Sequence, residues 1–141
     1  MATIRLELVT PDKGDVLSKD IDMLIVRSTA GELGILPRHA NLLTELLPHA
    51  MKVKMDGGET LVAIGGGFME VTPEQITILA DSAELPENID VDRAKRALQR
   101  AEERIAQYKQ ATKDSLIDIA RANKALARAK ARLLVKNVPF N

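Results

Sequence analysis

The chain has 141 residues, room for one ordinary domain or for a compact domain with a helical appendage. Apolar residues make up 45% of it and aromatic residues only 2%, which excludes general disorder and disfavours stacking of bases or sugars on aromatic rings. The net charge is zero, but residues 1–88 hold seven Lys/Arg against fourteen Asp/Glu, and residues 89–141 hold thirteen against six. The second half should therefore be attracted to an acidic surface: its own first half, a nucleotide, a nucleic acid or another subunit.

The chain contains no cysteine, so disulfides, thiolate metal sites and cysteine nucleophiles are excluded, and a reducing compartment is favoured. The first residues, Met-Ala-Thr-Ile-Arg-Leu-Glu, lack the apolar core of a secretory signal. No stretch approaches the roughly eighteen apolar residues of a membrane span. We expect any link to a membrane to come through partners.

Residues 1–84 are expected to form an antiparallel β-sandwich or flattened barrel. Short runs alternate apolar and polar residues; in one of them Ile21, Met23 and Ile25 share a face. Turn signals separate the runs, for instance Asp56-Gly57-Gly58, at the spacing typical of small all-β domains. The predicted strands lie at 3–8, 21–25, 52–56, 60–64, 68–71 and 75–80.

Near residue 82 the apolar period changes from two to that of a helix. Residues 85–88 are expected to be a connector, 89–136 an antiparallel hairpin of two helices that turns back at 110–115, and 137–141 a tail. Each helix carries one narrow, alanine-rich stripe, which buries few apolar atoms and predicts a weakly held hairpin. The stripe residues are Ala94, Ala97, Leu98, Ala101, Ile105 and Tyr108 in the first helix, and Ile119, Ala122, Leu126, Ala129 and Leu133 in the second.

Residues for catalysis are scarce. His39 and His49 are the only histidines, they lack metal-ligand spacing, and we interpret both as hydrogen-bonded loop residues. Gly65-Gly66-Gly67 is followed by Phe68 and a strand pattern, not by Lys-Ser/Thr and a helix, so a strand bulge is favoured over a phosphate-binding loop. We predict no catalytic residue and no metal site, which disfavours a hydrolase.

Basic side chains recur at helical spacing in the second half. Arg93 and Arg100 lie two turns apart on the first predicted helix, and basic residues recur every three or four positions from 121 to 132. Such a run indicates a solvated face, a phosphate-binding pocket or a surface that docks on an acidic partner. Nucleic acid is disfavoured because no aromatic residue interleaves the run. Asp90, just before the first helix, is expected to be its N-cap.

Four segments in order resemble the epsilon subunit family of F-type ATP synthases. They are 31–40 (Gly-Glu-Leu-Gly-Ile-Leu-Pro-Arg-His-Ala), 66–71 (Gly-Gly-Phe-Met-Glu-Val), 76–80 (Ile-Thr-Ile-Leu-Ala) and 89–94 (Ile-Asp-Val-Asp-Arg-Ala). The resemblance implies a non-catalytic rotor subunit, one copy per complex, whose sandwich lies against the γ subunit and the membrane c-ring. Glu32 and His39 match residues expected to contact the stalk or ring.

In that family the helical hairpin either folds on the sandwich or extends along γ and blocks ATP hydrolysis. The resemblance implies that the extended hairpin meets the catalytic β subunit through an inhibitory basic face, which comprises Arg121, Lys124, Arg128, Lys130 and Arg132. It also implies a peripheral location at the cytoplasmic face of the cell membrane, or of the thylakoid in a photosynthetic source.

Some bacterial members bind ATP as a regulatory ligand that holds the hairpin folded, with no cofactor otherwise required. Their motif resembles residues 89–94, and the matching positions are Glu84, Asp90, Arg93, Arg100, Arg128 and Arg132. The link between the helices is expected to be longer than in those relatives, which could shift the arginines of the second helix. An alternative function is a free-standing nucleotide-sensing or adaptor module that never joins a motor.

Overall fold

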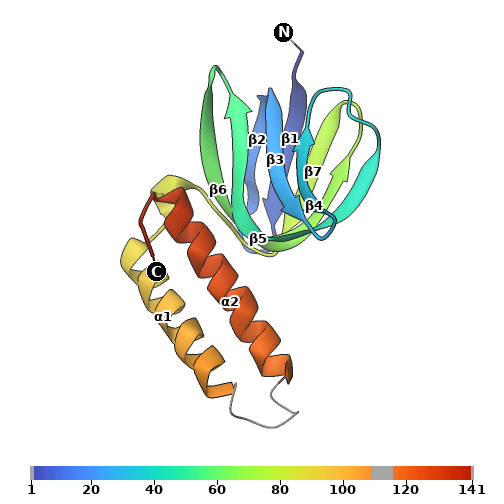
Figure 1. Cartoon of the computed structure of the whole chain (residues 1–141). Coiled ribbons are helices and arrows are strands. Elements are labelled where there is room, and N and C mark those ends of the chain that lie inside the picture. Colours follow the sequence, from blue (N-terminus) through green and yellow to red (C-terminus); the bar gives the residue numbers. More distant parts are fainter. Residues whose placement is uncertain (1, 109–115, 141) are drawn as a thin grey trace.

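The computed structural model describes residues 2–108 and 116–140. An eight-stranded β-sandwich is followed by two helices that form a separate arm (Figure 1). The strands are β1 (Ile4–Thr10), β2 (Gly14–Ile21), β3 (Met23–Ser28), β4 (Gly31–Ile35), β5 (Leu42–Met55), β6 (Gly58–Val71), β7 (Gln75–Ala80) and β8 (Ala83–Glu84). The helical elements are the 3₁₀ turn η1 (Pro86–Asn88), α1 (Val91–Tyr108) and α2 (Leu116–Val135).

The strands hydrogen-bond in the order β2-β1-β7-β6-β5-β3-β4, and β8 adds to β6. All pairs are antiparallel except β1 with β7, which is parallel, so the purely antiparallel expectation was wrong at that one pair. β5 and β6, of 14 residues each, run the length of the sheet, which curls so that one face encloses the core (Figure 1). The predicted sandwich is therefore confirmed.

The core consists of inward-facing aliphatic side chains. On β1 these are Ile4, Leu6 and Leu8, as the alternation predicts. On β3, however, Leu24 and Val26 are buried, so the prediction that Ile21, Met23 and Ile25 share one inward face was wrong. The chain turns at residue 22, between β2 and β3, and a slip of one residue exchanges the two faces of a strand.

The glycine run lies inside β6, which confirms a strand and excludes a phosphate-binding loop. Gly66 and Gly67 have φ of 100° and 145°, values that residues with a side chain rarely adopt. A Cβ on Gly67 would overlap the carbonyl oxygen of Leu79 on β7, so these two strands approach closely only because no side chain intervenes. A Cβ on Gly65 would overlap Ser82 and press on the side chain of Arg128 from α2.

The two helices pack together through their alanine-rich stripes, with Ala94, Leu98, Ala129 and Leu133 in one buried cluster. α2 also lies against β5 and β6. Ala131 meets Ala63 of β6 and Ile89 in a small cluster that is separate from the sandwich core. The stripe prediction therefore missed a second buried face of α2. The predicted turn at 110–115 lies outside the described residues.

The segment after α2 folds back on the hairpin. Asn137 adopts φ of 56°, and the N–H of Val138 donates to the carbonyl of Leu133 at 2.9 Å, which ends the helix in a left-handed cap. Val138 and Phe140 then pack on the interhelical cluster, with the ammonium of Lys130 5.8 Å from the Phe140 ring centre. The tail thus adds apolar contacts to a hairpin whose seam is largely alanine. Within the described residues, neither helix is long and apolar enough to cross a membrane.

Candidate functional site

A cavity of about 260 Å³ lies where the sandwich edge, the start of α1 and the end of α2 meet. Its polar and charged lining residues come from four elements and their junctions: Glu84, Asn88, Asp90, Arg93, Arg100 and Arg132. Five of these match the positions that the family resemblance associates with ATP; Asn88 was missed. The sixth predicted residue, Arg128, lies outside this cavity.

Arg132 of α2 and Glu84 of β8 form the firmest polar link between the helices and the sandwich. The guanidinium Nε donates to the Glu84 carboxylate at 2.6 Å, and the two side chains are only 26% and 21% exposed. Partial burial shields such a pair from solvent and salt more than a surface pair. Because both partners also line the cavity, a ligand bound there would contact the same residues that hold the hairpin down.

Asp90 begins α1. Its carboxylate Oδ1 accepts the backbone N–H of Arg93 at 3.0 Å, and its carbonyl accepts the N–H of Ala94 at 3.0 Å, so the predicted N-cap is present. The first turn of the helix thereby presents its positive end toward the cavity, and the side chains of Arg93 and Arg100 follow along one face. A cavity with carboxylates, an amide and guanidinium groups can bind both the hydrogen-bonding groups of a nucleoside and phosphate oxygens.

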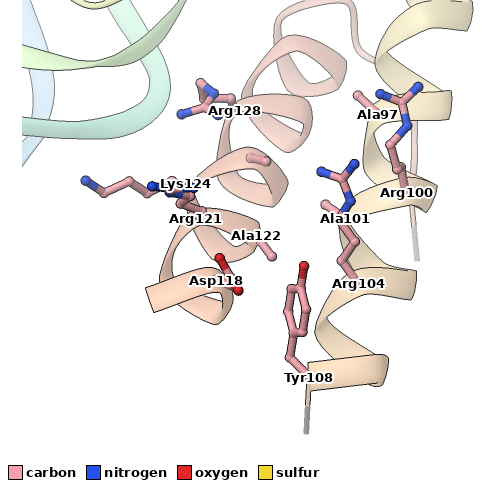
Figure 2. Close-up of a pocket in the computed structure, with 11 residues that line it drawn as sticks. Ala97, Arg100, Ala101, Arg104, Tyr108, Asp118, Arg121, Ala122, Lys124 and Arg128 are labelled. Atoms are coloured by element: carbon pink, nitrogen blue, oxygen red, sulfur yellow. The ribbon is translucent and has the colours of Figure 1, made fainter. Parts of the chain in front are cut away.

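The predicted inhibitory basic face does not form one surface in the folded hairpin. Arg121, Lys124 and Arg128 line a groove between the helices (Figure 2). Lys130 instead faces the sandwich and the Phe140 ring, and Arg132 is paired with Glu84. In this conformation two members of the set are therefore engaged with other parts of the same chain.

The predicted stalk contacts lie at different places on the sandwich. Glu32, on β4, lines a hollow against α2 and pairs with Arg27 at 3.8 Å. His39 lies beyond the other end of β4 in the link to β5, where its Nδ1 is 2.7 Å from the carbonyl of Ala40. The structure does not bring the two into one cavity.

Sequence analysis missed an apolar patch on the outer face of the sheet. Phe68 of β6 is 56% exposed and lies directly across from Leu79 of β7, which is 58% exposed. Leu43 and Leu47 of β5 are also exposed and lie diagonally across from Phe68. The alternation in these strands showed which face is outside, but the register that gathers four large apolar side chains comes only from the sheet. These four adjoining side chains form a candidate interaction surface.

His49 was predicted in a loop, but it lies within β5 at the junction with α2. Its Nε2 accepts the backbone N–H of Arg27 at 3.1 Å, at the irregularity in the pairing of β3 with β5. Nδ1 must therefore carry the ring proton, which it donates to the carbonyl of Leu47 at 2.6 Å. The ring thus replaces a missing strand-to-strand hydrogen bond, and it can do so only while it is neutral.

Burial is the largest influence on His49 and lowers its pKa below the ordinary value of 6.5; the hydrogen bond to the Leu47 carbonyl opposes it, the charge of Arg27 lowers the pKa further, and Glu32 opposes weakly. Protonation would break the bond from Arg27 and add a cation beside Arg27 and Lys130, with Glu32 as the one facing carboxylate. Because the unfolded chain takes up this proton more readily than the folded one, the contribution of His49 to stability should be fully present above pH 6.5 and should be lost as the pH drops toward the folded pKa.

We expect the melting temperature of the wild-type protein to fall as the pH is lowered below 6.5. In His49→Gln this fall should be much smaller, because a neutral amide can still accept from the N–H of Arg27 and donate to the carbonyl of Leu47. The difference between the two profiles isolates His49 from carboxylates that titrate at lower pH. Parallel profiles for the two proteins would show that His49 does not govern the effect.

No cluster of three or more His, Asp or Glu side chains suited to a metal ion exists among residues 2–108 and 116–140. The carboxylates and guanidinium groups that line the cavity can form hydrogen bonds and ion pairs with a bound molecule.

Two family models match the chain. Residues 3–86 match the β-sandwich domain of the ATP synthase delta/epsilon chain, and residues 87–137 match the long α-helix domain of the same chain. The ATP synthase epsilon chain of Alkalihalophilus pseudofirmus is 52% identical over 114 residues, which are 81% of this chain and 85% of that one. The epsilon chain of Halalkalibacterium halodurans is 50% identical over 114 residues, with the same coverage of both chains.

Solved structures share the fold at lower identity. A chain of the Euglena gracilis mitochondrial ATP synthase, in a structure of its OSCP, F1 and c-ring, matches with a TM-score of 0.74 and 24% identity over 93% of this chain and 79% of that chain. A chain from the central stalk and c-ring of the Tetrahymena thermophila enzyme matches with a TM-score of 0.59 and 14% identity over 96% and 97%. Sandwich, helical hairpin and sequence all agree, and the chain belongs to the epsilon subunit family of F-type ATP synthases.

Proposed function

We propose that this chain is the central-stalk rotor subunit that couples the catalytic head to the membrane c-ring and inhibits ATP hydrolysis when its helices are released. In this proposal the subunit itself is not catalytic. ATP, bound in the cavity between sandwich and hairpin, is the regulatory ligand that holds the helices folded. The observation that carries the proposal is the Glu84–Arg132 pair, which joins the two units at the wall of the cavity.

The cavity can favour the folded hairpin because it exists only when three elements are together. Glu84 belongs to the sandwich, Arg93 and Arg100 to α1, and Arg132 to α2. A ligand that binds only the assembled cavity stabilises it by RT ln(1 + [L]/Kd), about 2.7 kcal/mol at a hundred times Kd. The contact to be stabilised comprises the Glu84–Arg132 ion pair, the cluster around Ala131 and the packing of one face of α2 on β5 and β6. A free energy of this size can therefore change which conformation dominates.

Separate packing of the two units allows release without unfolding. The sandwich core, the interhelical cluster and the small contact around Ala131 are three distinct groups of buried side chains. Detaching α2 exposes mainly the last of these. Release would also free Arg132 from Glu84 and expose the side of Lys130 that faces the sandwich, so that the members of the basic face could meet an acidic segment of the catalytic β subunit.

The sandwich would anchor the subunit. The patch of Leu43, Leu47, Phe68 and Leu79 is suited to the γ subunit because a large exposed apolar surface needs a protein partner. Glu32 and His39 are the proposed contacts to the lower stalk and the c-ring. Attachment through these partners would place the chain, as a peripheral subunit, at the cytoplasmic face of the membrane.

Titration of the isolated protein with MgATP tests the ligand. We expect ATP to raise the melting temperature of the wild type and to shift NMR signals of residues around the cavity. Arg93→Ala should abolish both effects, because it removes a guanidinium group from the lining. Arg96→Ala, on the same helix but outside the cavity, should keep them and so controls for the loss of one charge. An equal ATP response in wild type and Arg93→Ala would refute this pocket.

A further inference from the structure

A hollow of about 360 Å³ lies where β3, β4 and the middle of β5 face α2. Its α2 side is apolar apart from Lys130, and its sandwich side carries Arg27, Glu32 and His49. Histidine is the side chain that changes its charge between about pH 5 and pH 8. Because α2 packs on β5 and β6, the hollow belongs to the surface that holds the hairpin down. A charge that appears on His49 therefore appears at the docking contact.

The neutral ring of His49 completes the strand surface that α2 faces. The pairing of β3 with β5 is irregular between Ile25 and Ser28, and there the N–H of Arg27 donates to ring Nε2. Since Nδ1 donates to the carbonyl of Leu47, both ring nitrogens are engaged in one neutral tautomer. Protonation removes the acceptor for Arg27. Ile25 and Arg27 line the hollow, so the strand that loses this hydrogen bond is one that α2 faces.

The charges around the hollow oppose a further cation. Arg27 of β3 and Lys130 of α2 are its cationic lining residues, and Glu32 of β4 is its carboxylate. Glu32 is already paired with Arg27 at 3.8 Å, and its side chain is 66% exposed, so water screens it. Among the described residues, β6, which pairs with His49 through Ile64, adds no charged group to the lining. Departure of α2 would take Lys130 away and return water to the ring.

The direction of the coupling follows from burial. Burial is the main cause that lowers the pKa of His49, and α2 supplies part of that burial. Release of α2 should therefore raise the pKa back toward 6.5. The released state then binds the proton more tightly than the docked state, so a fall in pH below 6.5 favours release and a rise restores docking. If the two states differ about tenfold in proton affinity, the docking constant falls about tenfold once both are protonated.

We infer that His49 is a proton-sensitive switch: its neutral ring keeps α2 docked on the sandwich, and its protonation releases the helix. The switch is separate from the cavity proposed for ATP, whose lining includes neither His49 nor Lys130. It rests on the movable hairpin of the proposed function, but not on ATP binding. In the assembled enzyme, acidification would strengthen inhibition at a fixed ATP concentration.

Energy transfer between two dyes measures docking on the full chain. The chain has no cysteine, so Glu74→Cys between β6 and β7 and Ala120→Cys on α2, both at exposed positions, give unique labelling sites. We expect the dyes to move apart reversibly between about pH 7.5 and about pH 5, with the docking constant falling about tenfold. His49→Gln has no titrating ring and should stay docked. His39→Gln removes the other histidine, which lies outside the hollow, and should respond as the wild type.

Two further measurements separate the possible failures. Amide NMR signals of β1 and β7 should keep their dispersion at the lower pH, and their loss together with the distance change would mean unfolding and overturn the switch. A constant dye distance, or equal responses in His49→Gln and His39→Gln, would also overturn it. Ala131→Asp buries a charge in the same contact and should show the longer distance already at neutral pH. Release in this variant alone would leave the movable hairpin standing and refute only the switch.

Discussion

Replacing Ala131 by aspartate is expected to detach α2 from the sandwich while both units stay folded. Ala131 is 2% exposed and meets Ala63 and Ile89, which are 5% and 7% exposed. A short carboxylate cannot reach solvent from this position, and an uncompensated buried charge costs about 3–5 kcal/mol. Shifting a two-state equilibrium from 99:1 to 1:99 takes about 5.5 kcal/mol, so the released hairpin should become a major species.

Hydrogen exchange measures this release directly. Amides of α2 next to β6 should exchange faster in Ala131→Asp, whereas amides of β1 and β7 in the sandwich core should keep their protection. Ala120→Asp places the same substitution at an exposed position of the same helix and should behave as the wild type. In the assembled enzyme the proposed function predicts stronger inhibition of hydrolysis by Ala131→Asp. Wild-type exchange in α2 of this variant would show that the Ala131 contact does not hold the hairpin.

Exchanging the charges of Glu84 and Arg132 is expected to separate docking from ligand binding. Glu84→Arg places two cations together and Arg132→Glu places two carboxylates together, and each should weaken docking by about 1.5–3 kcal/mol, the range for hydrogen bonds to charged groups. The double variant restores opposite charges at the same two positions. Docking should therefore recover in the double variant, with a coupling energy of similar size.

The same three variants report on the cavity. Stabilisation by MgATP should not return with docking in the double variant, because the carboxylate and the guanidinium have exchanged places around the ligand. Hydrogen exchange in α2 measures docking, and the ATP-dependent rise in melting temperature measures binding. If the loss of docking free energy in the double variant equals the sum of the losses in the two single variants, the Glu84–Arg132 pair does not couple the helix to the sandwich.

Much of the fold could be predicted from local pattern. The alternation at Ile4, Leu6 and Leu8 and the change of period before α1 both depend on near neighbours along the chain, and both are confirmed. Errors arose where distant contacts decide. His49 lies in a strand because β6 pairs with β5 through Pro48 and His49, although the Pro-His pair by itself is typical of a loop. Which side chains of β3 face the core was decided by the turn at residue 22, which shifts the alternation by one position.

The candidate site was less predictable than the fold. Asp90 as an N-cap needs only the helix that follows it, and it is found. Whether Glu84 meets Arg132, 48 residues later, depends on the angle at which the hairpin docks. That docking depends on Ala131, which sequence periodicity did not single out because the interhelical stripe dominates the pattern.

The amino-acid sequence by itself predicted strand segments within β1, β3, β5, β6 and β7, the two helices, the opposite charges of the two halves and the family, whereas β2, β4, β8 and the first part of β5 came only from the structure. Only the tertiary structure decided that five of the residues predicted to bind ATP line one cavity, whereas Arg128 lines another. It also decided that the basic residues of α2 are divided between these two cavities and the hollow against the sandwich. The physical reason is range. Apolar periodicity acts between residues a few positions apart, whereas the meeting of charges from β8, α1 and α2 depends on how whole elements pack.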